Sequence, residues 1–189
     1  MDERERLNLI NVFEKTAEAL KKGDVKGLKN LSNQTIHDAA IYQDEFSVSV
    51  AVLVYSLGKM HEREMHYGGF KGWKVYCDVC LAGLEYPKEY LIRSDLEGFR
   101  DSLKKYLESI MKVDPKLKQH IHDVLQKARI NKASRLYEHG LSLGRTAELL
   151  GISRFDLMDY IGKTYIADVR ENLTVGAKKR LDFARSIFA

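Results

Sequence analysis

A chain of 189 residues is long enough for one large domain or two small ones, with a sizeable buried core. The composition of 44% hydrophobic and 31% charged residues, with two cysteines, excludes a fibrous protein, a disulfide-stapled miniprotein and a wholly disordered chain. Only two prolines interrupt the chain, which favours helices. The first residues, MDERERLNLI, lack the regions of a secretory signal, and no apolar run approaches about 18 residues, so we expect a cytoplasmic protein without a membrane segment.

The net charge of +4 is too small to indicate a nucleic-acid partner, but it is unevenly distributed. Residues 1–114 carry 17 basic and 19 acidic side chains, whereas residues 115–189 carry 14 basic and 8 acidic ones. The two parts therefore have net charges of −2 and +6. This asymmetry indicates that the C-terminal part contacts a polyanion.

Apolar residues at helical spacing predict the first helix. They are Leu7, Ile10, Phe13, Ala17 and Leu20. Lys21, Lys22 and Gly23 form the expected end of that helix, because basic residues and a glycine are favoured there. Asp24 then supplies a capping carboxylate for a second helix that extends toward Tyr42.

Residues 46–60 are compatible with two structures. Alternating serine and valine favour a strand, whereas the length of the segment and an apolar face at helical spacing favour a helix. That face consists of Val50, Leu53, Val54, Leu57 and Met60. We expect a buried helix.

A C-x-x-C pair follows a glycine-rich turn at residues 67–73. Cys77 and Cys80 are compatible with redox chemistry or with half of a metal site, but no second pair completes four zinc ligands. The surrounding spacing is that of an amphipathic helix, formed by Trp73, Cys77, Cys80, Leu81 and Leu84. Because cysteine often packs as a small hydrophobe, we expect both in the core, in a helix that ends at Tyr86-Pro87.

Asp114 followed by Pro115 is a strong helix start, a capping carboxylate before a proline in the first helical position. It comes after a further predicted helix that closes near Lys112, and it coincides with the change in charge. We therefore place a domain boundary at residue 114. Residues 1–114 form a helical domain of unknown role, and residues 115–189 form a second domain.

Residues 132–163 contain the most informative pattern of the chain. A helix ending at His139-Gly140 is followed by a short helix from about Leu143 to Leu150 and by a second one introduced by Ser153. Ala147 has to be small where the helices cross, and Gly151 occupies the tight turn between them. A small shared core follows from Leu150, Ile152, Leu157 and Ile161. This arrangement is the helix-turn-helix signature.

Residues 143–161, LGRTAELLGISRFDLMDYI, resemble the helix-turn-helix superfamily of prokaryotic DNA-binding proteins. They are most similar to a small and poorly characterised family of antitoxin-like helix-turn-helix proteins. In that family, a glycine and an Ala-Glu-Leu segment precede a Ser-Arg-aromatic start of the recognition helix. The resemblance covers about 30 residues, so it implies DNA binding for the C-terminal domain and nothing for residues 1–114.

The resemblance makes Leu143–Leu150 the supporting helix and Ser153–Tyr160 the recognition helix. Side chains at the start of the latter then face the major groove, and they are Ser153, Arg154, Phe155 and Met158. Arg154 is suited to a bidentate contact with guanine or to a phosphate, and Ser153 to a helix cap or a phosphate. Backbone contacts are expected from Arg145, Lys132 and Arg135.

Asp156 and Asp159 oppose this interpretation, because a carboxylate on the recognition helix repels phosphate unless it accepts from cytosine or pairs with a cation. The alternative is a tri-helical module for protein contact without DNA, in which Phe155 and Met158 are the anchors. A second alternative is a metal-dependent hydrolase that uses N-terminal His and Asp residues. HEREMH, residues 61–66, lacks the four-residue spacing of a zinc motif, so we expect no enzyme and no cofactor.

After a short strand or an extended link at residues 164–168, Thr174 caps a final helix with an apolar face and basic flanks. Such a helix packs on its own domain or on a second subunit. A homodimer presents two recognition helices one DNA turn apart, about 34 Å. The sequence thus predicts an all-α protein, an N-terminal helical bundle followed by a tri-helical helix-turn-helix domain with a C-terminal helix. We expect it to bind double-stranded DNA as a transcriptional regulator, with the N-terminal domain available to a protein partner and no part in a membrane.

Overall fold

The computed structural model describes residue 1 and residues 3–163, and this part of the chain consists of α-helices without a strand. The helices are α1 (Glu3–Lys22), α2 (Val25–Tyr42), α3 (Glu45–His61), α4 (Glu64–Tyr67), α5 (Trp73–Ala82), α6 (Glu85–Ile92), α7 (Leu96–Lys112), α8 (Pro115–Glu138), α9 (Leu143–Leu150) and α10 (Arg154–Lys163). The all-α prediction is confirmed. The extended link at 164–168 and the helix after Thr174 lie outside the described residues.

Aspartate caps determine where several helices begin. A carboxylate just before the helix accepts a backbone N–H of the first turn, which has no partner within the helix. The donor and acceptor pairs are Gly27 to Asp24, Ser47 to Asp44, Gly98 to Asp95 and Leu117 to Asp114. The predicted starts at Asp24 and Asp114 are thereby confirmed, and the ambiguous segment 46–60 is a helix.

The predicted end of the Cys77 helix at Tyr86-Pro87 is wrong. Helix α5 already ends at Ala82, and Pro87 is the third residue of the next helix, α6. Proline is tolerated there because the N–H groups of the first helical turn have no carbonyl partner within the helix. A proline alone does not distinguish the end of one helix from the first turn of the next.

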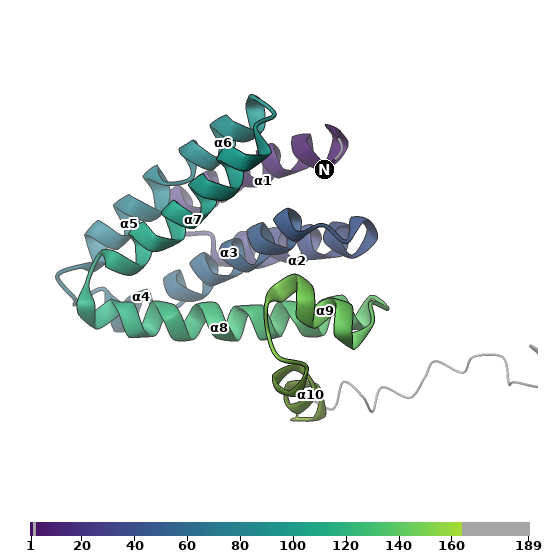
Figure 1. Ribbon diagram of the computed structural model, residues 1–189. Coiled ribbons are helices and arrows are strands. Elements are labelled where there is room, and N and C mark those ends of the chain that lie inside the picture. Colours follow the sequence, from purple (N-terminus) through teal and green to yellow (C-terminus); the bar gives the residue numbers. More distant parts are fainter. Residues whose placement is uncertain (2, 164–189) are drawn as a thin grey trace, which may run out of the picture.

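Two hydrophobic clusters form the interior, and α3 contributes to both. The first joins α1 to α7 with the beginning of α8, through Leu117, Ile121 and Val124. The second joins α2 and α3 to the end of α8 and to α9 and α10. Figure 1 shows α8 running along the α2–α3 pair, with α9 and α10 at its C-terminal end.

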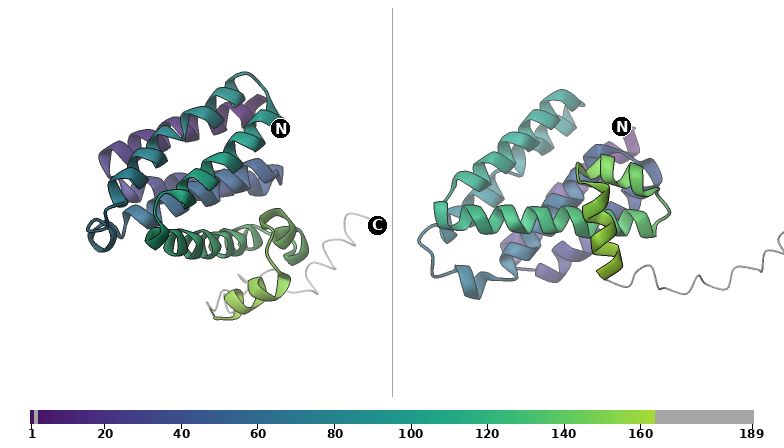
Figure 2. Two further views of the ribbon diagram at one scale, coloured as in Figure 1. Left: turned by 60° about the vertical axis from the view of Figure 1, so that its left-hand side comes forward. Right: turned by 60° about the horizontal axis from the view of Figure 1, so that its bottom comes forward.

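Because α8 begins at the predicted boundary and packs on helices from the N-terminal part, the two parts share core residues across residue 114. The division into domains remains a prediction. Figure 2 shows that α10 lies at the edge of the molecule, on the side of α8 away from α1 and α6. Within the described residues, no helix has the length and apolar character needed to cross a bilayer.

Candidate nucleic-acid interface

Two short helices joined by a tight turn form the end of the described chain. Gly140, with a φ of +93°, follows α8, and the Ser142 hydroxyl accepts the N–H of Arg145 to cap α9. Gly151, with a φ of +59°, ends α9 in the left-handed conformation that favours glycine. The Ser153 hydroxyl then accepts the N–H of Asp156 at 3.0 Å and caps α10. The sequence predicted the positions of Gly140, Gly151 and Ser153, but not the cap at Ser142.

Helix α10 is attached to the rest of the molecule along a narrow stripe. Of its ten residues, Leu157 and Ile161 are buried. They pack in the second cluster together with Leu150 of α9 and Ala133 and Leu136 of α8. Ile152 in the turn is partly buried against the same cluster, as the sequence predicted. Tyr160 is half-buried against α8, and the side of α10 that carries Phe155 and Met158 is open to a partner.

The candidate contact residues of α10 point to solvent. Phe155 is 78% exposed and Met158 is 59% exposed, and Ser153 and Arg154 are exposed as well. Exposure of large apolar side chains to water is unfavourable, so a partner that covers them is favoured. The structure thus brings together four of the seven predicted site residues at the start and on the open side of one helix.

Arg154 lies across the start of α9. Its guanidinium is so close to Gly144 that a Cβ at that position would lie 3.1 Å from Nη2. This contact was not predicted from the sequence, although a glycine in the first turn of a helix is a usable sign of a close approach. Among the described residues, Arg154 has no acidic partner, so its charge is available to an anion.

The two arginines expected to hold a DNA backbone are ion-paired within their own helices. Arg145 contacts Glu148 at 3.0 Å and also donates to the backbone oxygen of Gln43 at 3.2 Å. Arg135 contacts Glu138 at 2.9 Å. All four charged side chains are at least a quarter exposed, and exposed pairs of this kind contribute only about 0–1 kcal/mol. Each arginine can therefore leave its carboxylate and bind a DNA phosphate at little cost in free energy.

Lys132 does not lie at this surface, which corrects its expected role in holding a DNA backbone. Its side chain is fully buried, and Nζ donates to Asn33 Oδ1 at 2.8 Å and lies 4.3 Å from the centre of the Tyr55 ring. Burial, reinforced by the nearby charge of Arg135, lowers the pKa of Lys132 to about 7. A phosphate outside the protein cannot reach this ammonium, so Lys132 is not part of the candidate interface.

The two acidic residues on α10 both have local partners. The Ser153 hydroxyl donates to Asp156 Oδ2 at 2.6 Å, which places a carboxylate at the positive end of the helix dipole. Asp159 pairs with Lys163 at 2.6 Å. The ion pair with Lys163 reduces the repulsion that Asp159 exerts on an approaching phosphate, whereas Asp156 keeps its charge two residues from Arg154.

The residues considered for an enzyme do not converge. Among the described residues, no group of three or more His, Cys, Asp or Glu side chains is arranged to hold a metal ion. Cys80 is buried and Cys77 is half-buried against the first cluster. Burial raises the pKa of both thiols, that of Cys77 to about 11 with a further contribution from Glu64 and Asp78, which disfavours the reactive thiolate.

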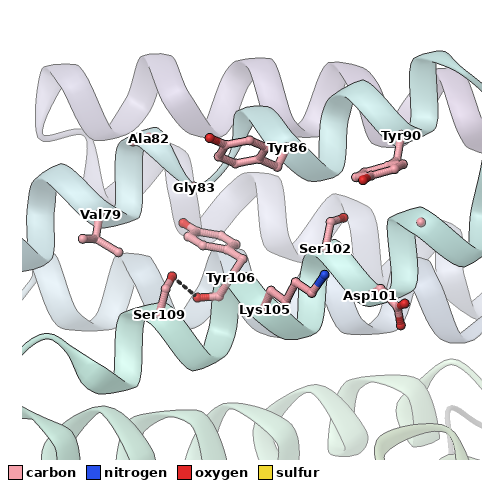
Figure 3. Close-up of a pocket in the computed structure, with 11 residues that line it drawn as sticks. Val79, Ala82, Gly83, Tyr86, Tyr90, Asp101, Ser102, Lys105, Tyr106 and Ser109 are labelled. Carbon is pink, nitrogen blue, oxygen red and sulfur yellow. Dashed lines mark hydrogen bonds between the residues drawn. The ribbon is translucent and has the colours of Figure 1, made fainter.

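A pocket of about 530 Å³ lies between α5, α6 and α7, on a different part of the molecule (Figure 3). Three of its polar side chains are engaged in the fold: Tyr106 donates to the Cys80 carbonyl, and Ser102 and Ser109 donate to backbone oxygens of their own helix. Tyr86, Tyr90, Asp101 and Lys105 also line it. None of its lining residues is a histidine or cysteine that would form a nucleophile and base pair.

The chain was compared with family models, with curated proteins and with solved structures, and none of them matches it. The function has to be argued from the site itself.

Proposed function

We propose that the protein binds double-stranded DNA in a sequence-specific manner through α10 and acts as a transcriptional regulator. The observation that carries this proposal is the open side of α10. A helix held by two buried residues presents an arginine that has no acidic partner in the described part of the chain, beside two exposed apolar side chains. The major groove, about 12 Å wide, admits a helix with such a surface.

Each exposed residue has a role in this proposal. Arg154 donates its two terminal N–H groups to the acceptors on the edge of a guanine, or to a phosphate. At the start of α10, which carries the positive end of the helix dipole, a phosphate oxygen would take the place of Asp156 Oδ2 as the acceptor of the Ser153 hydroxyl. Phe155 and Met158 provide apolar contact for a thymine methyl group.

Arg135 and Arg145 would hold the DNA backbone on either side of the groove. Both side chains are about half exposed, and both are paired with a carboxylate that solvent already screens. Binding then depends on salt, because each phosphate neutralised by an arginine releases counterions. We also propose a homodimer, since two copies of α10 about 34 Å apart would read a palindromic site.

The exposure of Phe155 and Met158 favours a second candidate, a protein-interaction module that does not bind DNA. Aromatic and methionine side chains are enriched in the centre of protein interfaces, where charged residues are depleted. In that case the same open side of α10 would dock on a protein partner, and Arg154 would lie at the rim of the contact. The two candidates use the same residues and differ in their dependence on salt.

Selection of duplexes from a random library by the purified protein, at two salt concentrations, tests the proposal. Enrichment of a motif at both concentrations, with weaker binding at high salt, is the expected result. Salt-sensitive binding without an enriched motif would contradict sequence specificity. No binding at low salt would contradict DNA binding and favour the protein-interaction candidate. Sedimentation at micromolar concentration tests the dimer, and the mass of a single chain would contradict it.

A further inference from the structure

A second pocket, of about 400 Å³, lies where α3, α8 and α10 meet, and we call it the α3–α8–α10 pocket. Helix α3 and the residues after it supply Tyr55, Lys59 and Arg63. Helix α8 supplies Lys127 together with apolar side chains, and α10 supplies Tyr160. The volume falls within the range of small-molecule sites, about 300–1,000 Å³.

The lining of this pocket is positively charged. Lys59, Arg63 and Lys127 line it, and none of its lining residues is acidic. Lys59 is paired with Glu62 at 2.9 Å, but Glu62 is shared with Lys29 at 2.6 Å. Hydrogen bonds from Lys29 and Lys59 lower the pKa of Glu62 to about 2, so that this carboxylate supplies one negative charge for two lysines.

Arg63 and Lys127 have no acidic partner among the residues that the structure describes, and both are exposed. Cations that line one pocket repel one another, and this repulsion is relieved when an anion binds between them. The guanidinium of arginine is particularly suited to carboxylate and phosphate oxygens. The charge of the pocket therefore selects for an anionic ligand.

Aromatic rings supply the second property of the pocket. Tyr55 and Tyr160 line it from opposite helices, and Asn131 donates to the Tyr160 hydroxyl at 3.3 Å, which helps to fix that side chain. Apolar side chains of α8, Val124 and Ile130, complete the lining. Lys132 Nζ lies 4.3 Å and Lys59 Nζ 5.7 Å from the centre of the Tyr55 ring. A flat ring therefore meets Tyr55 at its edge and packs on the Tyr160 ring, since aromatic pairs stack or meet edge to face.

Tyr160 belongs to the inner part of α10, since it bonds to Asn131 of α8, whereas Phe155 and Met158 are exposed. The pocket therefore lies on a different side of α10 from the surface proposed to bind DNA. We propose that the α3–α8–α10 pocket binds a small molecule that joins a flat ring to an anionic group, with Arg63 and Lys127 on the anion and the tyrosines on the ring. This site does not depend on DNA binding.

Calorimetric titration of the whole protein tests the site with two probes, adenosine 5′-monophosphate and the aromatic carboxylate 1-naphthoate. At least one of them should bind with a dissociation constant below about 1 mM. If the nucleotide is the ligand, adenosine and inorganic phosphate should each bind at least about tenfold more weakly. If the carboxylate is the ligand, naphthalene methanol takes the place of adenosine as the neutral comparison. The tighter probe identifies the source of the anion.

Substitutions in the lining test whether the probe binds in this pocket. The double substitution Arg63→Gln with Lys127→Gln should weaken binding of the tighter probe at least about tenfold, because both anion contacts are lost. Lys118→Gln is the matched control, since Lys118 is exposed on α8 and does not line the pocket. Absence of binding by both probes, equal binding of the neutral comparison, or unchanged affinity in the double variant would each overturn the proposal. A double variant that loses affinity for DNA but still binds the probe would also overturn the proposal.

Discussion

Helices α3 and α10 show how differently two helices of one protein are held. In α3, 11 of 17 residues are buried, and the helix contributes to both hydrophobic clusters. In α10, only Leu157 and Ile161 of ten residues are buried. Substitution of a side chain in a helix that is enclosed on most sides lowers the stability of the fold, whereas substitution on the open side of α10 does not. Residues on that open side are therefore free to serve recognition.

The largest effect is expected from truncation within α3. Leu57→Ala should lower the free energy of unfolding by about 2–5 kcal/mol, because a fully buried side chain leaves a cavity. Phe155→Ala, on the open side of α10, should change it by less than about 0.5 kcal/mol although it removes a larger side chain. Urea unfolding followed by circular dichroism measures both. Similar losses in the two variants would remove the distinction between the helices.

Lys132 is a buried polar residue beside α3, and its burial should make the stability of the protein depend on pH. With a pKa of about 7 in the folded protein against an ordinary value of 10.5, the unfolded chain binds a proton between these values that the folded protein lacks. The free energy of unfolding therefore gains up to about 1.4 kcal/mol per pH unit from this group as pH rises above 7.

Lys132→Met removes this contribution. Between pH 7 and pH 9, the wild type should gain about 2 kcal/mol of stability relative to this variant, measured by urea unfolding at each pH. Lys118→Met, an exposed lysine on the same helix, should show no such difference. Parallel stability curves for the wild type and Lys132→Met would show that Lys132 keeps its proton on folding.

The turn before α10 should show an intermediate effect. Gly151→Ala forces a side chain into a backbone with φ of +59° and should cost about 1–2 kcal/mol. Gly162→Ala is the matched control within α10, because a Cβ there meets no atom of residues 1 and 3–163 within 4 Å and alanine favours a helix. That control should be neutral or stabilising in thermal unfolding. A destabilised Gly162→Ala together with a neutral Gly151→Ala would contradict the turn geometry.

A smaller loss is expected at the cap of α10. Ser153→Ala removes the acceptor for the Asp156 N–H and should cost about 1 kcal/mol, and Ser153→Thr should retain most of the stability. Hydrogen exchange of the α10 amides is the suitable measurement, because local fraying precedes global unfolding. Equal protection in the alanine and threonine variants would mean that the cap contributes nothing.

Local signals explain which parts of the fold the sequence predicted. The caps at Asp24 and Asp114 and the turn at Gly151 each depend on residues within about one helical turn, so their patterns are readable in the chain. Pro87 was misinterpreted because the same residue is favourable both after a helix and in its first turn. Gly83, directly after the last residue of α5, was the available sign of the helix end, because glycine is favoured there.

Tertiary packing explains what the sequence did not predict. Lys132 is buried through contacts with Asn33, 99 residues earlier, and with the Tyr55 ring. The α3–α8–α10 pocket combines Arg63, Lys127 and Tyr160 from segments that no local pattern connects. The exposed surface of α10 was predictable because its apolar stripe is narrow, and only Leu157 and Ile161 are needed to attach it.

The central claim is that the open side of α10 reads DNA, and Arg154 is its most direct test. On a duplex obtained by selection, Arg154→Ala should bind about 5- to 150-fold more weakly than the wild type, a loss of about 1–3 kcal/mol, with unchanged thermal stability. Arg93→Ala removes one exposed positive charge at the end of α6 and should bind nearly as well as the wild type. Equal affinity of Arg154→Ala and wild type for that duplex would contradict the claim.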